Sequence, residues 1–365
     1  MKNAVLVMHA VIRADASIQI GTGHTMRCLT LAEEIQKQGF QVSFICGNLP
    51  GNLNAYIREK GYPVFELNDS TESGESSFDW EKDLQHSLSV LNERYAKVSW
   101  MIVDHYGLDY RWECAVRSNV DHVMVIDDLS NRIHDCDILL DQNYYLKKDR
   151  YRGLVRDSCV QLLGPKYALL RPEFLEQRGK LNRRNGVIQN ILIFFGGSDP
   201  GNETAKALKA VKKLNWPGLK AKVILGSSNP LIDQISGEIA PDPGIECLVQ
   251  VDNMAELISE ADLSLGAVGS VTWERCALGL PSIVSITAQN QVELAESLAE
   301  KNYIYFIGYA TETTSTSYSE AIKRLSQDKN LYLSMVEKGL DLVDAKGAIR
   351  TARTIREVHD RRSKN

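Results

Sequence analysis

The sequence predicts an α/β fold of two Rossmann-like domains, each built on a parallel sheet. The first observation is length, because 365 residues are too many for one ordinary domain and suffice for two of about 150–180 residues each. The second is that short apolar, β-branched segments alternate with amphipathic helical segments along the whole chain, which is the pattern of βαβ units. The third is that the strand segments are almost uniformly apolar, as expected for parallel strands covered on both faces.

The first half of the chain contains a series of strand segments and one clear helix. The helix is expected at residues 24–38, because apolar residues recur from Cys28 at i, i+3, i+4 and i+7, and Gly39 provides a C-terminal stop. The strands are expected at Ala10–Ala14, Gln41–Cys46, Trp100–Asp104, His122–Asp127 and Asp137–Leu140.

The second half repeats this scheme after a linker. Residues 171–189 are the best linker candidate because they combine Pro172, a charged run and the turn pair Asn185-Gly186. We therefore expect a first domain at residues 1–175, a second at 188–345, and a terminal helix and tail at 346–365. The expected strands are Ile191–Phe195, Lys222–Leu225, Ile245–Leu248, Asp262–Leu265 and Ser282–Ile286, and the expected helices are Glu203–Leu214, Asn253–Glu260, Thr272–Leu278, Gln291–Glu300 and Tyr318–Gln327.

Composition and charge exclude several classes of protein. The composition is ordinary for a globular protein, with 44% hydrophobic and 24% charged residues. The net charge of −5 argues against a nucleic-acid partner, which favours a basic surface. The seven cysteines are scattered without a CxxC pair, as is typical of free thiols in a reducing compartment. No apolar run is long enough to span a membrane or to form a signal peptide. We expect a cytoplasmic monomer that binds neither nucleic acid nor membrane.

The first candidate site lies where the first strand meets the first helix. Arg13 and Asp15 end the strand segment and are candidate substrate contacts, and Gly23 allows a ligand to approach the backbone closely. A dinucleotide cofactor is not expected, because Met26 stands where the third glycine of that fingerprint belongs. His24 begins the helix, whose N-terminus favours a neutral, base-competent imidazole. The alternatives are an ordinary glycine turn and a surface histidine.

The second candidate site follows the first strand of the second half. The strand ends in Gly196-Gly197-Ser198-Asp199, and Asn202 with Glu203 opens a helix. Backbone amides in such a turn bind a phosphate or a sugar, so Ser198 and Asp199 are candidate substrate contacts. The alternative is a tight turn with a helix cap. Ser198 is not a nucleophile, because the G-x-S-x-G pattern is absent.

The third candidate site is a later strand-to-helix turn around Gly269-Ser270. Its backbone and the Ser270 hydroxyl suit a diphosphate. Glu274 falls one helical turn later, where a carboxylate accepts two hydrogen bonds from ribose hydroxyls; the alternative is a favourable charge at a helix start. Asn290 follows another strand and offers an amide to a sugar or base.

Weaker candidates follow the remaining strands of the first half. Tyr106, in Asp104-His105-Tyr106, is either a ligand contact or a rim aromatic. The acidic pairs Asp127-Asp128 and Asp135–Asp137 are poor evidence for a metal, and His24 with Cys28 alone does not make a zinc site. We therefore expect neither a metal nor a cofactor.

Together these motifs resemble those of one family. The run R-A-D-A-S-x-x-I-G-x-G-H-x-x-R-C-L, residues 13–29, is similar to the N-terminal signature of UDP-2,4-diacetamido-2,4,6-trideoxy-β-L-altropyranose hydrolases of pseudaminic acid biosynthesis. The resemblance covers residues 9–340, so that Met1–Met8 precede it as an early start or an added strand residue or two. Further matches are Asp104–Gly107, Phe195–Asp199, Gly269-Ser270, Trp273–Cys276 and Ala288–Gln291.

The resemblance implies a fold and a set of roles. The family is similar in fold to glycosyltransferase B enzymes, whose two domains face each other across a cleft. It implies that UDP binds the second domain, and that His24 is the base that activates water. Tyr106 and Asn290 would contact the sugar, and Ser270 and Glu274 the phosphate and ribose. A UDP-sugar transferase and a non-catalytic nucleotide-sugar sensor are the rival hypotheses, and the acidic segment 68–83 argues against a lipid-linked acceptor.

Overall fold

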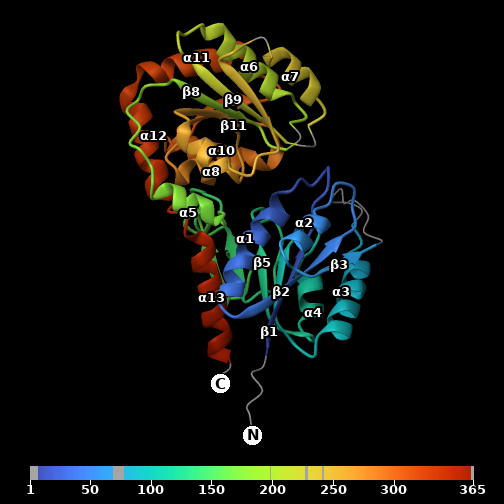
Figure 1. The fold of residues 1–365 in the computed structure, drawn as a ribbon. Coiled ribbons are helices and arrows are strands. Elements are labelled where there is room, and N and C mark those ends of the chain that lie inside the picture. The colour runs from blue at the N-terminus through green and yellow to red at the C-terminus, as the bar shows by residue number, and fades with distance from the viewer. Residues whose placement is uncertain (1–6, 69–77, 198, 227–228, 241, 363–365) are drawn as a thin grey trace. The chain divides into compact units, whose positions relative to one another are not determined.

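The computed structural model describes residues 7–68, 78–197, 199–226, 229–240 and 242–362 (Figure 1). The chain divides into two compact units. The first comprises residues 1–143, 147–169 and 346–365, and the second comprises residues 144–146 and 170–345. The chain therefore leaves the first unit after Leu169 and returns to it at Lys346.

The described part of the first unit holds a seven-stranded parallel sheet in the order β3-β2-β1-β4-β5-β6-β7. The strand order reverses between β1 and β4, which is the topological switch point at which open α/β sheets bind ligands. The strands are β1 (Met8–Ala14), β2 (Phe40–Gly47), β3 (Val64–Leu67), β4 (Val98–Asp104), β5 (Val120–Ile126), β6 (Ile138–Asp141) and β7 (Val160–Leu163).

Helices cover both faces of this sheet, which explains why its strands are apolar throughout. Alternate residues of β1 point to opposite sides, so that Ile12 packs into one buried cluster and Val11 into another. The Ile12 cluster includes α1 and α13, which lie together on one side of the sheet in Figure 1. The helices are α1 (Gly23–Lys37), α2 (Asn54–Glu59), α3 (Trp80–Arg94), α4 (Tyr110–Val116) and α13 (Gly347–Arg362).

The second unit repeats the architecture. Its described residues form a six-stranded parallel sheet in the order β10-β9-β8-β11-β12-β13, with the switch point between β8 and β11. The strands are β8 (Asn190–Phe194), β9 (Lys220–Leu225), β10 (Ile245–Val249), β11 (Leu263–Ala267), β12 (Ser282–Ile286) and β13 (Tyr305–Tyr309). The helices are α5 (Pro172–Arg178), α6 (Glu203–Leu214), α7 (Ile232–Ile239), α8 (Met254–Glu260), α9 (Val271–Ala277), α10 (Val292–Glu300), α11 (Ser315–Gln327) and α12 (Lys329–Leu342).

The boundary between the units differs from the expected one at the first crossing, whereas the second unit ends at residue 345, the expected position. Helix α5 belongs to the second unit and not to a first domain ending at residue 175, because Arg178 donates hydrogen bonds to the carbonyls of Ala277, Leu340 and Val343. The segment 346–365 contains the expected terminal helix, and this segment belongs to the first unit. Helix α13 buries apolar side chains such as Ile355 in the core of the first unit.

The α/β fold with two parallel sheets is as predicted. The strands that the sequence did not reveal lie at the sheet edges, and helices α2, α3, α4, α5, α7 and α12 were not predicted either. Strands β3, β7 and β13 are short or only partly buried edge strands, so they lack the uniform apolar pattern of central strands. Of the acidic segment 68–83, residues 69–77 lie outside the described residues, whereas Asp83 is a buried residue of α3. None of the helices in the described ranges has the length and hydropathy that crossing a bilayer requires.

Candidate active site and nucleotide-binding loops

The loop between β1 and α1 lies at the carboxyl edge of the first sheet, beside its switch point. The Ser17 hydroxyl oxygen accepts hydrogen bonds from the N–H groups of Gln19 and Ile20, at 3.1 and 3.0 Å. Gly21 adopts a left-handed φ of +79°, which only glycine adopts without strain. The loop then reaches the exposed Gly23, the first residue of α1. The predicted first site is therefore a hydrogen-bonded turn at the edge where a ligand is expected.

His24 is oriented by a buried carboxylate. It lies in the first turn of α1, and its Nδ1 atom is 2.6 Å from Oδ1 of Asp104, the last residue of β4. The Asp104 side chain is completely buried, whereas that of His24 keeps 12% of its exposure. Because a carboxylate only accepts, this contact assigns the proton to Nδ1 and leaves the lone pair on Nε2. A histidine held in this way is equipped to act as a general base.

Arg27 keeps Asp104 ionised. Its Nε and Nη2 atoms donate to the two oxygens of Asp104, each at 2.6 Å. Burial raises the pKa of Asp104, but the charge of Arg27 and the hydrogen bonds from Arg27 and His24 outweigh it and hold this pKa well below the usual range. Arg27 stands three residues after His24, so one helical turn supplies both partners of the carboxylate.

Tyr106 packs against His24 and is itself held in place. The two rings meet edge to face with their centroids 4.8 Å apart. The Tyr106 hydroxyl donates to Oδ1 of Asp128 at 2.7 Å, and Arg27 Nη1 donates to Oδ2 of the same carboxylate at 3.3 Å. Burial and the Asp128 charge raise the pKa of Tyr106 far above its usual value, so its hydroxyl is neutral. His24, Arg27, Asp104, Tyr106 and Asp128 thus form one network, which we call the His24 cluster.

Arg13 and Asp15 are more deeply buried than expected for substrate contacts. Arg13 is fully buried in β1, where it pairs with Asp15 and with Asp83 of α3. The Arg13 Nη2 atom donates to Asp15 Oδ2 at 2.9 Å and to Asp83 Oδ2 at 2.7 Å. Asp15 also accepts from the N–H of Gly47 at 2.6 Å and lies 3.2 Å from Nε2 of His105. These contacts connect the loop after β1 to the ends of β2 and β4.

No role in this region was predicted for Arg27, Asp83 or Asp128, although Arg27 lies in the predicted first motif and Asp128 in a predicted acidic pair. Arg27 had a recognisable signal, because it follows His24 by one helical turn on the same face. Asp128 follows β5 at the carboxyl edge, where any polar side chain is a candidate. Asp83 had no such signal, since it reaches Arg13 from 70 residues away in sequence.

The glycine turn after β8 is shaped by backbone contacts. Gly196 has a left-handed φ of +97°. A Cβ atom on Gly226, which follows β9, would lie only 2.3 Å from the carbonyl oxygen of Gly197, so the two glycine segments pass in close contact. Ser198 lies outside the described residues.

Asp199 acts as a cap of helix α6. Its two carboxylate oxygens accept from the N–H groups of Glu203 and Thr204, at 3.0 and 2.9 Å, and Asn202 accepts from Ala205 at 3.4 Å. Asp199 and Asn202 already satisfy these three N–H groups, so the helix cap that the sequence left open as the alternative is present here. An anion here would meet the Gly196-Gly197 turn instead.

The turn after β11 places Ser270 and Glu274 one helical turn apart. Ser270 is exposed and precedes α9, and Glu274 is partly buried within it. Burial raises the pKa of Glu274 to about 7, and the weak attraction of Arg171, whose Nη2 is 3.8 Å from Oε1, opposes this shift only in part. A half-buried carboxylate with so little compensation is suited to accept hydrogen bonds from a ligand.

Asn290 is exposed on a short 3-10 helix, Gln289–Gln291, at the carboxyl end of β12. The Oε1 atom of Gln291 accepts from the N–H and the hydroxyl of Thr287, at 2.9 and 3.2 Å, which fixes this turn. Ser270, Glu274 and Asn290 thus all follow strands of the second sheet at its carboxyl edge.

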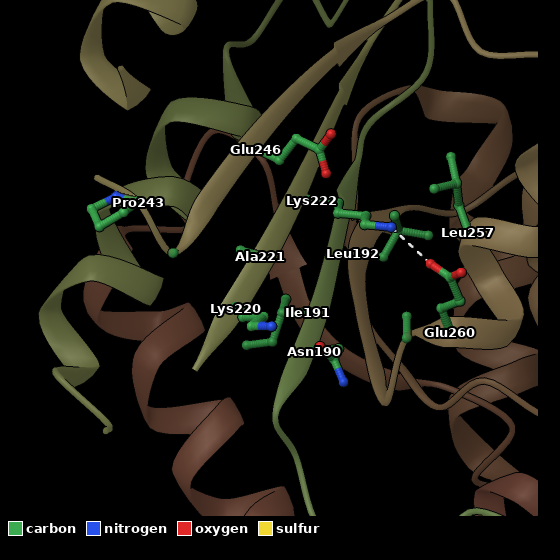
Figure 2. A pocket seen from close by; sticks show the side chains of 12 residues that line it. Asn190, Ile191, Leu192, Lys220, Ala221, Lys222, Pro243, Glu246, Leu257 and Glu260 are labelled. Carbon is green, nitrogen blue, oxygen red and sulfur yellow. Dashed lines mark hydrogen bonds and ion pairs between the residues drawn. The ribbon is translucent and has the colours of Figure 1, made fainter. Parts of the chain in front are cut away.

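The pocket in Figure 2 lies at the opposite edge of that sheet. It is lined by the first residues of β8 and β9, Asn190 and Lys220, and by the ion pair of Lys222 with Glu260 at 2.7 Å. None of the predicted site residues lines it. Within the described ranges, no group of three or more His, Cys, Asp or Glu side chains is arranged to hold a metal ion.

Comparison with known proteins decides the family. The chain is 31% identical over 296 residues to the UDP-2,4-diacetamido-2,4,6-trideoxy-β-L-altropyranose hydrolase of Campylobacter jejuni, which covers 81% of this chain and 98% of that one. The chain belongs to the family of this hydrolase. The chain also resembles the spore coat polysaccharide biosynthesis protein SpsG of Bacillus subtilis. The two are 24% identical over 97% of this chain and 99% of SpsG. No protein-family model matches the chain.

Solved structures show the fold. MurG of Acinetobacter baumannii superimposes with a TM-score of 0.67 at 16% identity, over 96% of this chain and 99% of its own. The UDP-GlcNAc 2-epimerase of Neisseria meningitidis, bound to UDP-GlcNAc, has a TM-score of 0.64 at 12% identity, over 96% and 99%. At these identities the similarity shows only the fold, which is the glycosyltransferase B architecture that the sequence predicted. The family assignment rests on the sequence identity to the hydrolase.

Proposed function

We propose that this nucleotide-sugar hydrolase breaks the sugar–phosphate bond of a UDP-activated 2,4-diacetamido-2,4,6-trideoxy sugar, giving free sugar and UDP, as a step of pseudaminic acid biosynthesis. Membership of the hydrolase family supports the substrate class. The observation that carries the chemistry is the contact of His24 with the buried Asp104, because it orients a partly exposed imidazole at a topological switch point.

His24 is the general base in the proposed mechanism. Its Nε2 atom takes a proton from water as the water oxygen attacks the anomeric carbon, and the bond from that carbon to the diphosphate oxygen breaks. Asp104 holds the Nδ1 proton and stabilises the imidazolium that forms. A single displacement of this kind inverts the anomeric configuration. Tyr106 positions the imidazole ring and contacts the sugar.

The second unit binds UDP in this proposal. Glu274 accepts hydrogen bonds from the ribose hydroxyls, and the turns at Gly196-Gly197 and Gly269-Ser270 bind the diphosphate through backbone N–H groups and the Ser270 hydroxyl. Asn290 contacts the sugar. UDP is a good leaving group, so oriented dipoles can stabilise its charge without a protonated acid or a metal ion. Arg13 and Asp15 support the catalytic loop, as their burial favours.

Incubation of the purified protein with the UDP-sugar alone tests the proposal. In an NMR time course, we expect UDP and free sugar to appear in equal amounts without lipid, protein or a second sugar. Release only after an acceptor is added would instead identify a transferase. UDP-sugar binding without turnover would identify a sensor.

Two further properties belong to this proposal. We propose that the enzyme acts in the cytoplasm, which is supported by its seven free cysteines, five of them buried. The monomeric state remains a prediction that light scattering of the purified protein would check.

A further inference from the structure

Arg275 of α9 is a buried cation that forms no ion pair with any described residue, and the attraction of the neighbouring Glu274 carboxylate is the least of the effects on its pKa. It is 1% exposed, and its Nη2 atom donates to the carbonyl of Ala267 at 2.6 Å and to the hydroxyl of Thr272 at 3.2 Å. Its Nε and Nη1 atoms have no hydrogen-bond partner among the described residues. Arg13, the other fully buried arginine among the described residues, differs because it is paired with two carboxylates.

The position of Arg275 places this charge at the switch point of the second sheet. A Cβ atom on Gly266 of β11 would lie 2.7 Å from Nη1 of Arg275 and 2.4 Å from the carbonyl oxygen of Phe194, the last residue of β8. The guanidinium therefore lies next to the ends of the two strands between which the order of the sheet reverses. Glycine at position 266 leaves the space that this packing needs.

Arg275 also holds the turn that follows β11. Its Nη2 atom donates hydrogen bonds to the carbonyl of Ala267 and to the hydroxyl of Thr272. The same hydroxyl accepts a hydrogen bond from the N–H of Gly269 at 3.2 Å. One side chain thus bridges the start and the end of the turn that leads to Ser270. Burial lowers the pKa of Arg275 to about 10, so it still carries its charge at neutral pH.

A buried charge without a counter-ion is costly, and proteins retain such a group where a ligand completes its neutralisation. We propose that Arg275 is a positioning residue for the diphosphate of the nucleotide. Its positive charge, beneath the Gly269-Ser270 turn, attracts this anion, and its hydrogen bonds hold the turn in the shape that binds the diphosphate. This inference rests on the proposed binding of UDP to the second unit.

The proposal predicts opposite effects on stability and on binding. Arg275→Met keeps an unbranched side chain and removes the unneutralised charge. We expect the melting temperature without ligand to stay the same or rise, since replacing a poorly compensated buried charge by an apolar residue is often neutral or stabilising. We expect the affinity for UDP to fall about tenfold to a hundredfold, as for a lost charge-assisted interaction, with the affinity for uridine nearly unchanged.

Arg184 provides the matched control in the same unit. Its guanidinium donates to the carbonyls of Ile258, Ala261 and Leu278, at 2.8, 3.1 and 2.6 Å, close to the amino ends of the strands. Arg184→Met removes the donors of these carbonyls and of the carbonyl of Ser259, which lies at 3.4 Å. We expect it to lower the melting temperature and to leave the ratio of UDP to uridine affinity unchanged, because it lies away from the proposed diphosphate site.

Calorimetric titration of UDP and uridine into the wild type and both variants distinguishes the outcomes. An unchanged UDP-to-uridine ratio in Arg275→Met would overturn the role of Arg275, and absence of UDP binding by the wild type would overturn the proposed function itself. Thr272→Val gives a second variant if Arg275→Met does not fold. It removes the hydroxyl shared by Arg275 and Gly269, so we expect a smaller loss of UDP affinity, again without loss for uridine. Equal losses for both ligands would contradict the proposal.

Discussion

The carboxylate of Asp104 lies 2.6 Å from Nδ1 of His24 and is completely buried, although the two residues are 80 positions apart in sequence. Parallel pairing of β1 with β4 brings them together, because Ala14 is in register with Asp104 and the helix that carries His24 follows β1. The fold therefore places the proposed base and its orienting group at the switch point, where the strand order of the sheet reverses.

The first prediction concerns His24. We expect His24→Ala to lower kcat by about 10²–10⁴-fold, the usual cost of removing a general base. Binding of UDP should persist, since the proposed nucleotide contacts lie in the second unit. His9→Ala is the control, because His9 lies near the other end of β1. A His24 variant with most of the wild-type kcat would remove this residue from the mechanism.

The second prediction concerns Asp104. Asp104→Asn removes the charge that stabilises the imidazolium and no longer selects one tautomer of His24, so we expect kcat to fall by about 10²–10⁴-fold. It also leaves the buried Arg27 without its main counter-ion, so the melting temperature should fall as well. Glu66→Gln, in a more exposed ion pair with Arg58, is the control for charge removal. Unchanged kcat in Asp104→Asn would mean that the carboxylate does not orient the base.

The sequence predicted His24 because a glycine turn and a helix start are local features. It placed Asp104 at the end of a strand for the same reason, but it did not join them. That contact depends on which strands are neighbours, and the order of strands is a property of tertiary packing that hydrophobic periodicity does not encode. Asp199 shows a second limit of the sequence. A carboxylate at this position can contact a ligand or cap a helix, and the sequence does not decide between the two; in the structure it caps α6.

The third prediction concerns the pH dependence of Glu274. Its pKa is raised to about 7 in the folded protein, above the ordinary value of 4.5 that applies to the unfolded chain. The folded state therefore binds more protons between these two values, and this contribution to stability is present below pH 4.5 and is lost as the pH rises through 7. Compared with Glu274→Gln, the wild type should lose melting temperature between pH 5 and pH 8.

The ionisation of Glu274 has the opposite effect on ligand affinity, which should increase with pH. Only the ionised carboxylate accepts hydrogen bonds from both ribose hydroxyls, so the affinity for uridine should rise between pH 6 and pH 8 in the wild type and stay flat in Glu274→Gln. Glu274→Ala should weaken UDP binding by about 1.5–3 kcal/mol for each lost charge-assisted bond. Calorimetry that finds equal affinity in all three proteins would contradict the ribose assignment.

The fourth prediction concerns the contribution of the buried Arg13–Asp83 ion pair to the stability of the first unit. Asp83→Ala removes the partner of Arg13 and of the Trp112 indole N–H, which donates to Asp83 at 3.0 Å. Breaking a buried ion pair from one side costs about 3–5 kcal/mol, and we expect this loss in the free energy of unfolding. Asp79→Ala, which removes the N-cap of the same helix, should cost only about 1 kcal/mol. Equal losses would show that the buried pair adds nothing beyond ordinary helix support.

The last prediction concerns which bond breaks. If His24 directs water to the anomeric carbon, hydrolysis in ¹⁸O-labelled water places the label in the sugar and leaves UDP unlabelled, and mass spectrometry of both products measures this. Label in the UDP phosphate would mean attack at phosphorus and would rule out the mechanism. The first-formed sugar should carry the inverted configuration, seen by NMR before mutarotation, because one displacement inverts and two retain.

Turnover should also persist in EDTA, since backbone dipoles and the charge of Arg275 stabilise the departing diphosphate in this scheme. Loss of activity in EDTA, with recovery on adding a divalent cation, would assign that stabilisation to a metal ion instead.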